Sequence, residues 1–433
     1  MQPDAAIYRA RRERVIAEMG EGAMVVATAP EVPRNRDTHY PYRHDSYFYW
    51  LTGFNEPEAV VVLIAGKEPR HILFCREKNE EREIWDGFRY GPAAAREVFA
   101  FDETFSFDAL DAELPKLLEN QPQLAYLIGR EAAWDAQVMG WLNAVRAKAR
   151  QGVHAPVRMV DARVWLDEMR LVKDGHELAL MRRAAEISTG AHRDAMRATR
   201  PGRHEYEIEA ELLSAFRRGG AEAPAYTSIV ASGPNACVLH YVFNNKPMRD
   251  GDLLLIDAAA EFGSYAADIT RTFPVNGKFS AAQKDAYELV LAAQREAIAA
   301  VRPGNHWNSP HEVAVRVLTQ GMVDLGLLKG EVDGLIESNA YNRFYMHRTG
   351  HWLGMDVHDA GEYKLKGEWR PLAPGMTLTV EPGLYIRPAD DVPAAFHNIG
   401  IRIEDDVVVT ESGCEVLTSP PKTVAEIETW MQS

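Results

Sequence analysis

Three cysteines in 433 residues leave little scope for disulfide or thiolate chemistry. Cys75, Cys237 and Cys414 are far apart, odd in number and in no paired spacing. The sequence therefore predicts neither a disulfide framework nor a thiolate zinc site. Such a composition suits a reducing compartment, and we expect a cytoplasmic protein.

Long hydrophobic runs and an excess of basic charge are also missing. No stretch approaches the roughly 18 uninterrupted apolar residues of a membrane helix, so we expect no membrane partner. The 63 acidic residues outnumber the 48 basic ones, and the formal net charge of −15 argues against a nucleic-acid partner. The early arginines between Arg9 and Arg14 alternate with acids and precede no apolar core, so we expect an ordinary surface helix there.

Several catalytic signatures are absent as well. The chain has no glycine-rich phosphate loop and no nucleophile-elbow serine. His311-Glu312 lacks the second histidine that the paired-histidine zinc proteases require. Nucleotide chemistry, serine-type hydrolysis and that class of zinc protease therefore find no support.

The length and the 46% hydrophobic content suit two domains, because one core rarely supports so long a chain. Strand-like runs at residues 24–28, 47–52, 59–64 and 71–74, with helical patterns at 107–118 and 132–148, indicate a mixed α/β domain. Lys173-Asp174-Gly175 interrupts the pattern, and a new helical run covers residues 177–197. We expect domains at residues 1–172 and 173–433.

A weak internal repeat marks the second domain. One predicted helix ends at Pro201-Gly202 and another at Pro303-Gly304, a shift of 102 residues (303 − 201), and Ser280 with Gln283 has capping-box spacing. Two structurally related halves of the second domain would explain why the Pro-Gly helix end recurs 102 residues later. Chance similarity is the alternative, because Pro and Gly end many helices.

Acidic residues in apolar strands are the most informative feature of this domain. Residues 252–273 resemble a hairpin, and a turn at Phe262-Gly263 would place Asp257 directly opposite Asp268. Opposed side chains lie about 5 Å apart at Cβ, close enough to hold a metal pair together. One or both aspartates could instead face solvent, because sequence fixes strand register poorly.

The second half repeats the pattern with glutamate. Glu381 and Glu404 each end an apolar alternation, although either could be a solvated strand end. A histidine-rich segment, residues 347–359, lies between the two acidic pairs, and its glycines favour a loop or strand edge. Spacing alone does not show which histidine is a ligand, and His240 could be structural. Carboxylates with histidine and no thiolate suit manganese first, with cobalt, iron or zinc as alternatives.

At these residues the chain resembles the pita-bread metallopeptidases, and within them aminopeptidase P. The resemblance runs through residues 239–241, 256–257, 267–277, 350–359, 380–385 and 400–406, which include Gly350-His351-Trp352-Leu353-Gly354 and Glu381-Pro382-Gly383. Residues 40–43, 51–59 and 83–85 look similar to the amino-terminal domain of aminopeptidase P. The resemblance implies an α+β fold: a smaller α/β domain, then a catalytic domain of pseudo-twofold halves around a curved antiparallel sheet.

The resemblance also implies two divalent metal ions, Mn²⁺ first. In the family pattern Asp257 binds one metal, Asp268 and Glu404 bridge both, and His351 with Glu381 completes the other. Glu381 would be the general base, and His240 with His358 would contact substrate and stabilise the tetrahedral intermediate. His347 and Arg402 match the proline-binding side, and Tyr385, grouped with them as substrate-binding, resembles a residue that supports such contacts from behind. One departure, Arg348-Thr349-Gly350 where small or apolar residues are usual, concerns specificity more than catalysis.

The implied activity is removal of the amino-terminal residue from peptides with proline second. A prolidase, which accepts only Xaa-Pro dipeptides, is the alternative within the enzyme class. A metal-free pita-bread module that binds proteins is the alternative from another class, but such modules lack several ligands and this chain has all five. Family members of this kind associate through the amino-terminal domain, so we expect a homodimer or homotetramer, with Tyr40-Pro41-Tyr42 and Trp85 as the aromatic set.

Overall fold

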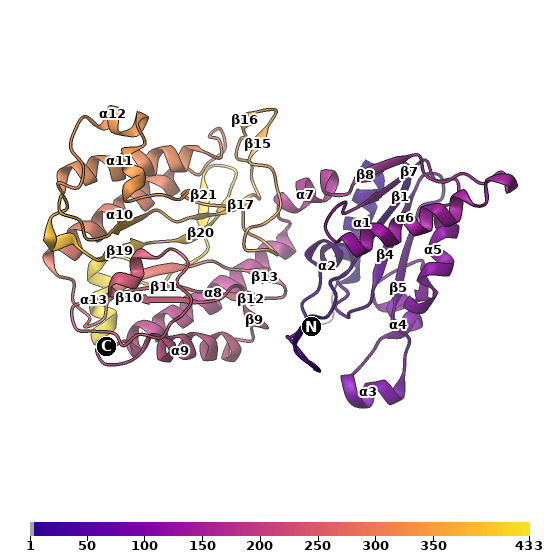
Figure 1. Ribbon diagram of the computed structural model, residues 1–433, viewed down its shortest axis with the longest axis horizontal. Helices are drawn as coiled ribbons and strands as arrows, with labels where there is room; N and C mark the ends of the chain where they lie inside the picture. Colours follow the sequence, from indigo (N-terminus) through magenta and orange to yellow (C-terminus); the bar gives the residue numbers. More distant parts are fainter. Residues whose placement is uncertain (1–3) are drawn as a thin grey trace. The chain divides into compact units, whose positions relative to one another are not determined.

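The computed structural model describes residues 4–433, which form two compact units (Figure 1). The first unit extends to Met169, and the second is Arg170–Ser433. The chain passes from one to the other within helix α7 (Arg163–Leu171), just before the Lys173-Asp174-Gly175 break in the sequence pattern. No helix among residues 4–433 is long and apolar enough to cross a membrane.

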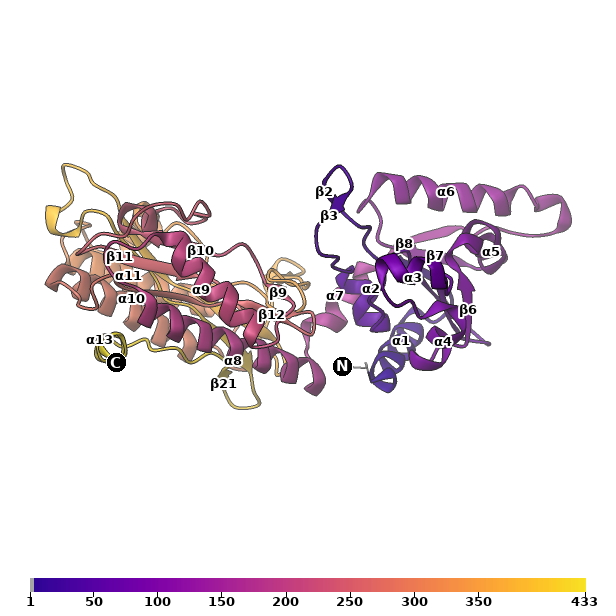
Figure 2. The same ribbon diagram turned by 90° about the horizontal axis from the view of Figure 1, so that it is seen from below.

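The first unit is a mixed sheet with helices on both faces (Figure 2). Its strand order is β6-β5-β4-β1-β7-β8. The strands are β1 (Gly22–Ala27), β4 (Val60–Ala65), β5 (Arg70–Cys75), β6 (Glu103–Ser106), β7 (Gln123–Tyr126) and β8 (Arg158–Asp161). The other elements are α1 (Ala5–Met19), α2 (Ser46–Thr52), α3 (Glu80–Asp86), α4 (Gly91–Val98), α5 (Leu110–Leu118), α6 (Ala132–Arg146) and the small hairpin β2 (Pro33–Asn35) with β3 (Thr38–His39).

Burial on both faces explains the strand sequences. Every residue of β4 is buried, and its Val-Val-Val-Leu-Ile-Ala sequence is the continuous apolar run expected of a strand covered on both sides. Leu114 of α5 and Trp141 of α6 pack on one face of the sheet. The predicted strands at β1, β4 and β5 and the predicted helices at α5 and α6 are therefore confirmed.

The predicted strand at residues 47–52 is wrong, because this segment is helix α2. The Asp45 carboxylate accepts a hydrogen bond from the Phe48 backbone N–H at 2.8 Å and caps the helix. Gly53, in the left-handed conformation at φ 65°, ends it. Phe48 and Leu51 share the buried face at helical spacing. The aromatic content of the segment indicated a strand, but the caps favour a short helix.

The predicted amino-terminal helix is confirmed as α1, although it is more than a surface helix. Arg12 is buried on it and donates hydrogen bonds to the carbonyl oxygens of Leu51, Phe99 and Ala100. This arginine therefore ties α1 to the ends of two other segments of the unit.

The second unit holds the acidic strands. Its helices are α8 (Gly175–Ala198), α9 (Glu205–Arg218), α10 (Ala281–Ala299), α11 (Ser309–Asp324), α12 (Val332–Glu337) and α13 (Val424–Gln432). Its longer strands are β10 (Ile229–Ser232), β11 (Leu253–Asp257), β14 (Thr270–Pro274), β17 (Thr377–Val380), β18 (Gly383–Ile386), β19 (Ile399–Arg402), β20 (Asp405–Val409) and β21 (Cys414–Val416). The pairs within β10-β11-β14, β17-β20-β21 and β18-β19 are all antiparallel.

The internal repeat of the sequence has a structural counterpart. Helices α8 and α10 are followed by α9 and α11, and in the view of Figure 1 the two pairs lie below and above the strands. His204 forms an isolated bridge with Pro247, and His306, 102 residues later (306 − 204), forms one with Pro371. The bridge at Pro247 comes shortly before β11, and the bridge at Pro371 shortly before β17. The two halves therefore repeat the helix pair and the isolated bridge that follows its first helix.

The register predicted for the acidic hairpin is wrong by two residues. Asp257 pairs with Thr270, and Phe262 pairs with Tyr265 in the short strands β12 (Ala260–Phe262) and β13 (Tyr265–Ala266). The turn residues are Gly263 and Ser264, both at positive φ, 57° and 68°. Two successive positive φ angles define the turn that suits a two-residue hairpin loop. Because the error is an even number, the side chains keep their faces.

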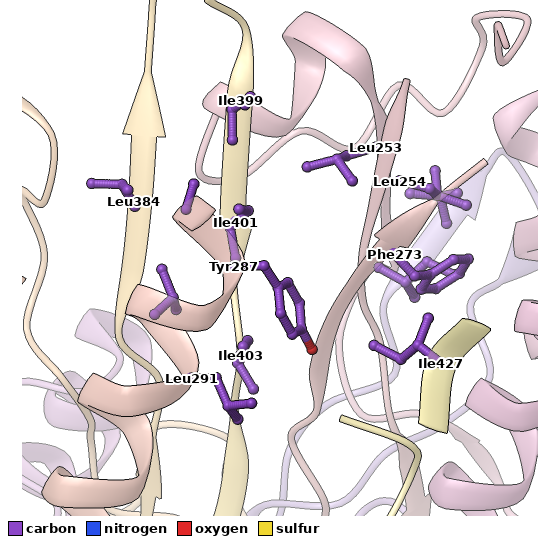
Figure 3. Close-up of a cluster of buried hydrophobic side chains, with 14 of the residues drawn as sticks. Leu253, Leu254, Phe273, Tyr287, Leu291, Leu384, Ile399, Ile401, Ile403 and Ile427 are labelled. Atoms are coloured by element: carbon purple, nitrogen blue, oxygen red, sulfur yellow. The ribbon is translucent and has the colours of Figure 1, made fainter. Parts of the chain in front are cut away.

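The core of this unit lies between the helices and the strands (Figure 3). Tyr287 of α10 extends between Ile401 and Ile403 on one side and Phe273 of β14 on the other. Its hydroxyl donates to the Lys422 carbonyl oxygen at 2.8 Å, so the buried polar group has a partner. Ser280 and Gln283 form the predicted capping box at the start of α10.

Candidate metal centre

A cavity of about 660 Å³ in the second unit brings the predicted residues together. All five predicted metal ligands line it: Asp257, Asp268, His351, Glu381 and Glu404. His240, His347, His358 and Arg402 line it as well, whereas Tyr385 lies behind it and contacts it through hydrogen bonds. Residues from both halves of the repeat therefore meet in one cavity.

The carboxylates of Asp257 and Asp268 both contact the hydroxyl of Tyr226. Asp257 is the last residue of β11, and Asp268 lies in the irregular segment just before β14. The Tyr226 hydroxyl is 2.5 Å from an oxygen of each carboxylate. The backbone N–H of Asp268 donates to the buried Asp406 carboxylate at 3.1 Å. Both carboxylates thus face the same space, although they are not directly opposed.

The second half supplies two glutamates and a histidine. Glu381 follows β17, and Glu404 lies between β19 and β20. The Thr270 hydroxyl donates to Glu404 at 2.6 Å. His351 Nε2 is 3.4 Å from Asp268 and 3.8 Å from Glu381. Potential ligand atoms of Asp268, His351 and Glu404 all lie within 4.8 Å of one another.

The hydrogen bond of His351 sets its tautomer. Its Nδ1 is 3.0 Å from the Trp352 carbonyl oxygen, which can only accept. The proton of the neutral ring therefore resides on Nδ1, and the Nε2 lone pair faces the carboxylates. A backbone carbonyl that orients a ring in this way is the usual support of a metal-binding histidine.

Burial and mutual repulsion perturb the acids. Burial, together with the charge of Asp268, raises the pKa of Asp257, although Arg402 opposes the rise. Burial raises the pKa of Glu381 to about 7 and that of Glu404 well above its usual range, where the charge of Asp268 adds to the effect. Burial alone would lower the pKa of His351, but the hydrogen bond to Asp268 and the charge of Glu381 raise it to about 9.

These shifts fit a cation at the centre of the cluster. Four carboxylates face one another, Asp268 and Glu404 buried and Asp257 and Glu381 half-buried, and only Arg402 among the cavity's arginines is bonded to one of them. A divalent cation would offset the repulsion and accept lone pairs from carboxylates and imidazole. Carboxylates with one histidine and no thiolate are the donors that hard or borderline metals prefer. The residues present therefore fit a metal site.

A hydrogen-bonded chain borders the cluster. Arg402 donates to Asp257 at 2.5 Å and to the Tyr385 hydroxyl at 3.0 Å. The Tyr385 hydroxyl is in turn 2.8 Å from His347 Nε2. His347 Nδ1 lies 2.8 Å from the Arg348 carbonyl oxygen, so Nδ1 carries the proton and Nε2 accepts from Tyr385. Burial and the charge of Arg402 lower the pKa of His347 to about 3, consistent with a neutral ring.

The two remaining histidines are exposed at the cavity. His240 lies in the loop before β11, and the ring of His358 is 4.1 Å from that of His351. Burial, together with the charge of His351, lowers the pKa of His358. The next residue, Asp359, is buried and accepts from Lys173 at 2.7 Å and Arg170 at 2.5 Å. This ion-pair network anchors the loop that carries His358.

Sequence reasoning missed several residues of the site. Tyr226 bonds both aspartates, Thr270 bonds Glu404, and Trp307 and Trp369 form part of the cavity wall. Tyr226 follows an Ala-Pro-Ala run without strand or helix periodicity, so no pattern singled it out. Thr270 lies within the predicted hairpin and within residues 267–277, but its residue type gives it no distinct role there. It could have been found from the correct register, which pairs it with Asp257.

Comparison with known proteins decides the family. Residues 179–411 match the model of metallopeptidase family M24, and residues 8–126 match the aminopeptidase P N-terminal domain. This protein belongs to metallopeptidase family M24. The expected α+β architecture, with a smaller α/β domain before a pita-bread catalytic domain, is confirmed for this metallopeptidase.

Relatives resemble the metallopeptidase over its whole length. A protein of Escherichia coli named Xaa-Pro aminopeptidase is 46% identical over 428 residues, covering 98% of this chain and 97% of that protein. One of Haemophilus influenzae with the same name is 45% identical over 427 residues, covering 98% and 96%. The structure of Pseudomonas aeruginosa aminopeptidase PepP is 51% identical, with a TM-score of 0.98 and coverage of 100% and 98%.

Proposed function

We propose that this metallopeptidase releases the amino-terminal residue from peptides whose second residue is proline. The observation that carries the proposal is the convergence of Asp257, Asp268, His351, Glu381 and Glu404 on one cavity. Its full-length relatives named Xaa-Pro aminopeptidase support the substrate class. In this proposal residues 1–172 form the aminopeptidase P-like domain, and residues 173–433 form the catalytic domain.

The proposal assigns two divalent metals to the five ligands, Mn²⁺ first and Co²⁺, Fe²⁺ or Zn²⁺ as alternatives. Asp257 would bind one metal, Asp268 and Glu404 would bridge, and His351 with Glu381 would complete the other. When bound, such a pair supplies a hydroxide at neutral pH and polarises the scissile carbonyl. The Trp352 carbonyl oxygen, which would hold the proton of a neutral His351 ring on Nδ1 and leave Nε2 for a metal, and the carboxylate-rich donor set support this assignment.

The chain's own groups then have distinct tasks. Glu381 is the candidate general base, because its carboxylate lines the cavity within 3.8 Å of His351 and a carboxylate there can accept a proton. Asp257, at the end of the cluster bonded to Arg402, would hold the substrate amine. His240 and His358, exposed at the cavity, would donate to the carbonyl oxygen as it gains charge.

The substrate's proline explains the other polar residues. An Xaa-Pro bond lacks an N–H, so a protease that grips that group handles it poorly. His347 and Arg402 line the cavity, and Tyr385 behind them is hydrogen-bonded to both, so the proposal gives the ring a fixed surface instead. The proposal places the proline there and leaves the cavity open beyond it.

The deciding assay compares kcat/KM for an Xaa-Pro dipeptide, an Xaa-Pro-Xaa tripeptide and a longer peptide, with metal-loaded enzyme. An aminopeptidase cleaves the tripeptide and the longer peptide. A prolidase cleaves the dipeptide alone, and that result would replace the proposal. Loss of activity on chelation and its return on adding Mn²⁺ would support the metal assignment. Full activity of verified metal-free enzyme would defeat it.

We further propose a cytoplasmic homodimer or homotetramer. Helix α3 exposes Ile84 and Trp85, each 82% accessible, and Phe88 beside it is 65% accessible. Tyr40 is also exposed, whereas the Tyr42 hydroxyl is tied to Thr28 at 2.8 Å. Such exposed aromatics suit an interface. Light scattering at micromolar concentration tests this, and Trp85→Glu should shift the enzyme toward monomer. A concentration-independent monomer would contradict it.

A further inference from the structure

Arg348 is exposed at the wall of the active-site cavity, and no carboxylate among residues 4–433 forms an ion pair with it. Its guanidinium donates to the side-chain oxygen of Asn308 and lies 5.3 Å from the centre of the Trp369 ring. Both partners are neutral. The arginine is therefore held in place while its charge stays uncompensated.

The other arginine of the cavity differs in this respect. Arg402 is buried and its guanidinium is bonded to Asp257 at 2.5 Å. The Asp257 carboxylate therefore already balances the positive charge of Arg402. Of the two arginines that line the cavity, Arg348 is the one available to an incoming anion.

The backbone around Arg348 is fixed. The Thr349 carbonyl oxygen accepts from the Glu381 N–H at 2.7 Å, and the Thr349 hydroxyl is 2.9 Å from His311 and 2.6 Å from the Tyr345 hydroxyl. Gly350 lies so close to β17 that a Cβ would collide with the Thr379 carbonyl oxygen. These contacts fix the backbone on either side of Arg348, whose guanidinium is exposed.

Neighbours of Arg348 place it beyond the proline-binding wall. Under the proposed function His347 contacts the proline ring, and Arg348 is the next residue outward, against Trp369 of the hairpin β15 (Lys364–Leu365) and β16 (Glu368–Trp369). The part of a peptide that reaches this exposed position is the part that follows proline.

We propose that Arg348 binds a carboxylate on the residue after proline, either the terminal carboxylate of a tripeptide or an acidic side chain. This inference rests on the proposed function. The planar guanidinium matches a carboxylate with two parallel hydrogen bonds, and its stacking on an indole reduces the entropy lost on binding. Because the group is exposed, solvent screens the pair, and we expect a preference of about fivefold to tenfold.

The experiment uses four peptides with metal-loaded enzyme: Ala-Pro-Leu, its amide, Ala-Pro-Glu-amide and Ala-Pro-Gln-amide. The first pair tests the terminal carboxylate and the second pair the side chain. Wild type should show a higher kcat/KM for the carboxylate member of at least one pair. Arg348→Gln should abolish that preference and leave the neutral peptides within about twofold, because only the charged contact is lost. Raising the salt concentration should shrink the preference.

Arg343→Gln is the matched control. Arg343 is an exposed arginine on the same stretch of chain, paired with Asp391 at 2.6 Å and outside this cavity. This variant should retain the wild-type preference. Equal kcat/KM for both members of both pairs in wild type, or an equal loss for all four peptides in Arg348→Gln, would overturn the inference.

A binding measurement separates this inference from the proposed function. If wild type cleaves none of the four peptides, the proposed function fails. Calorimetry with Pro-Leu and Pro-Leu-amide then tests Arg348 without turnover. Wild type should bind Pro-Leu about fivefold more tightly than its amide, and Arg348→Gln should bind both alike. Equal affinity of wild type for the two dipeptides would overturn the role of Arg348.

Discussion

Few groups of the protein satisfy or neutralise the individual carboxylates of the candidate metal centre. Thr270 and Tyr226 supply hydroxyl hydrogen bonds at 2.5 to 2.6 Å, and Arg402 supplies a positive charge to Asp257. Hydroxyl donors satisfy lone pairs but do not cancel charge. The repulsion among the remaining acids is therefore left for a bound cation, and each acid that holds it should be indispensable.

Glu404→Gln or Asp268→Asn should lower kcat/KM by about 100-fold or more and reduce the metal content, because each replaces a proposed bridging oxygen by an amide. Kinetics and metal analysis of the purified variants test this. Glu415→Gln, which changes an exposed glutamate paired with Arg182, is the control and should behave as wild type. A Glu404→Gln enzyme with full metal and wild-type kcat/KM would contradict the bridging role.

Tyr385→Phe should lower kcat/KM for an Xaa-Pro-Xaa peptide by about tenfold. The change leaves His347 Nε2 without its donor and Arg402 Nη1 without its acceptor, and an unsatisfied buried group costs about 1 to 3 kcal/mol. Steady-state kinetics test this. Tyr287→Phe removes a buried hydroxyl far from the cavity and should change the unfolding temperature but not kcat/KM. Equal kinetics for the two variants would contradict the prediction.

The sequence predicted those site residues whose charge is unusual in an apolar strand, and it missed those whose residue type is common there. An acid at the end of an apolar strand is conspicuous, and so Asp257, Glu381 and Glu404 were found from the sequence. Tyr226 and Thr270 are residue types that suit a sheet, so nothing in the sequence distinguishes them from core residues. Their role exists only through contacts across the fold.

At the scale of elements, turn and cap residues decided where the predictions succeeded. The capping pairs Ser280 with Gln283 and Asp174 with Glu177 mark the starts of α10 and α8, and both helices lie where the sequence predicts them. The acidic hairpin was predicted two residues out of register, because the turn falls on Gly263 and Ser264, both at positive φ, and not on Phe262 and Gly263. Serine seldom adopts a positive φ, so the residue type at position 264 does not indicate a turn residue.

Ser280→Ala should lower the free energy of unfolding by about 1 kcal/mol, because the N-cap hydroxyl accepts from the Gln283 N–H at 3.3 Å. Denaturant unfolding of the metal-loaded enzyme measures the change. The kcat/KM should be unaffected, since no residue of α10 lines the cavity. Ser280→Thr keeps a capping hydroxyl and should lose less. Equal stability of wild type and Ser280→Ala would show that the cap contributes nothing.

At the scale of the whole molecule, the catalytic unit combines a stable core with a cluster that opposes folding unless it is neutralised. Hydrophobic contacts such as those of Tyr287 hold the two halves of the repeat against each other. The same packing buries Glu381, Glu404 and Asp257 and raises their pKa values. Metal affinity and folding should therefore be coupled in this unit.

The sign of this coupling follows from the pKa shifts. A group whose pKa is raised in the folded protein binds more protons there than in the unfolded chain, so its contribution to stability falls as pH rises through the folded value. Glu381, with a pKa of about 7, and His351, shifted from 6.5 to about 9, both have this sign. Metal-free enzyme should therefore lose stability between pH 6.5 and pH 9.

Bound metal should reverse this trend, because it requires deprotonated carboxylates and a neutral imidazole, and its affinity rises with pH. The unfolding temperature of chelator-treated enzyme should fall from pH 6.5 to pH 9, while that of Mn²⁺-loaded enzyme stays higher and the difference between the two widens. Comparing the two forms at each pH cancels the histidines outside the cluster. In Glu381→Gln the metal-free decline should be shallower, since a titrating group of the cluster is gone and the charge that raises the pKa of His351 goes with it. A difference in unfolding temperature that stays constant across this range would mean that the buried acids and His351 do not link metal binding to folding.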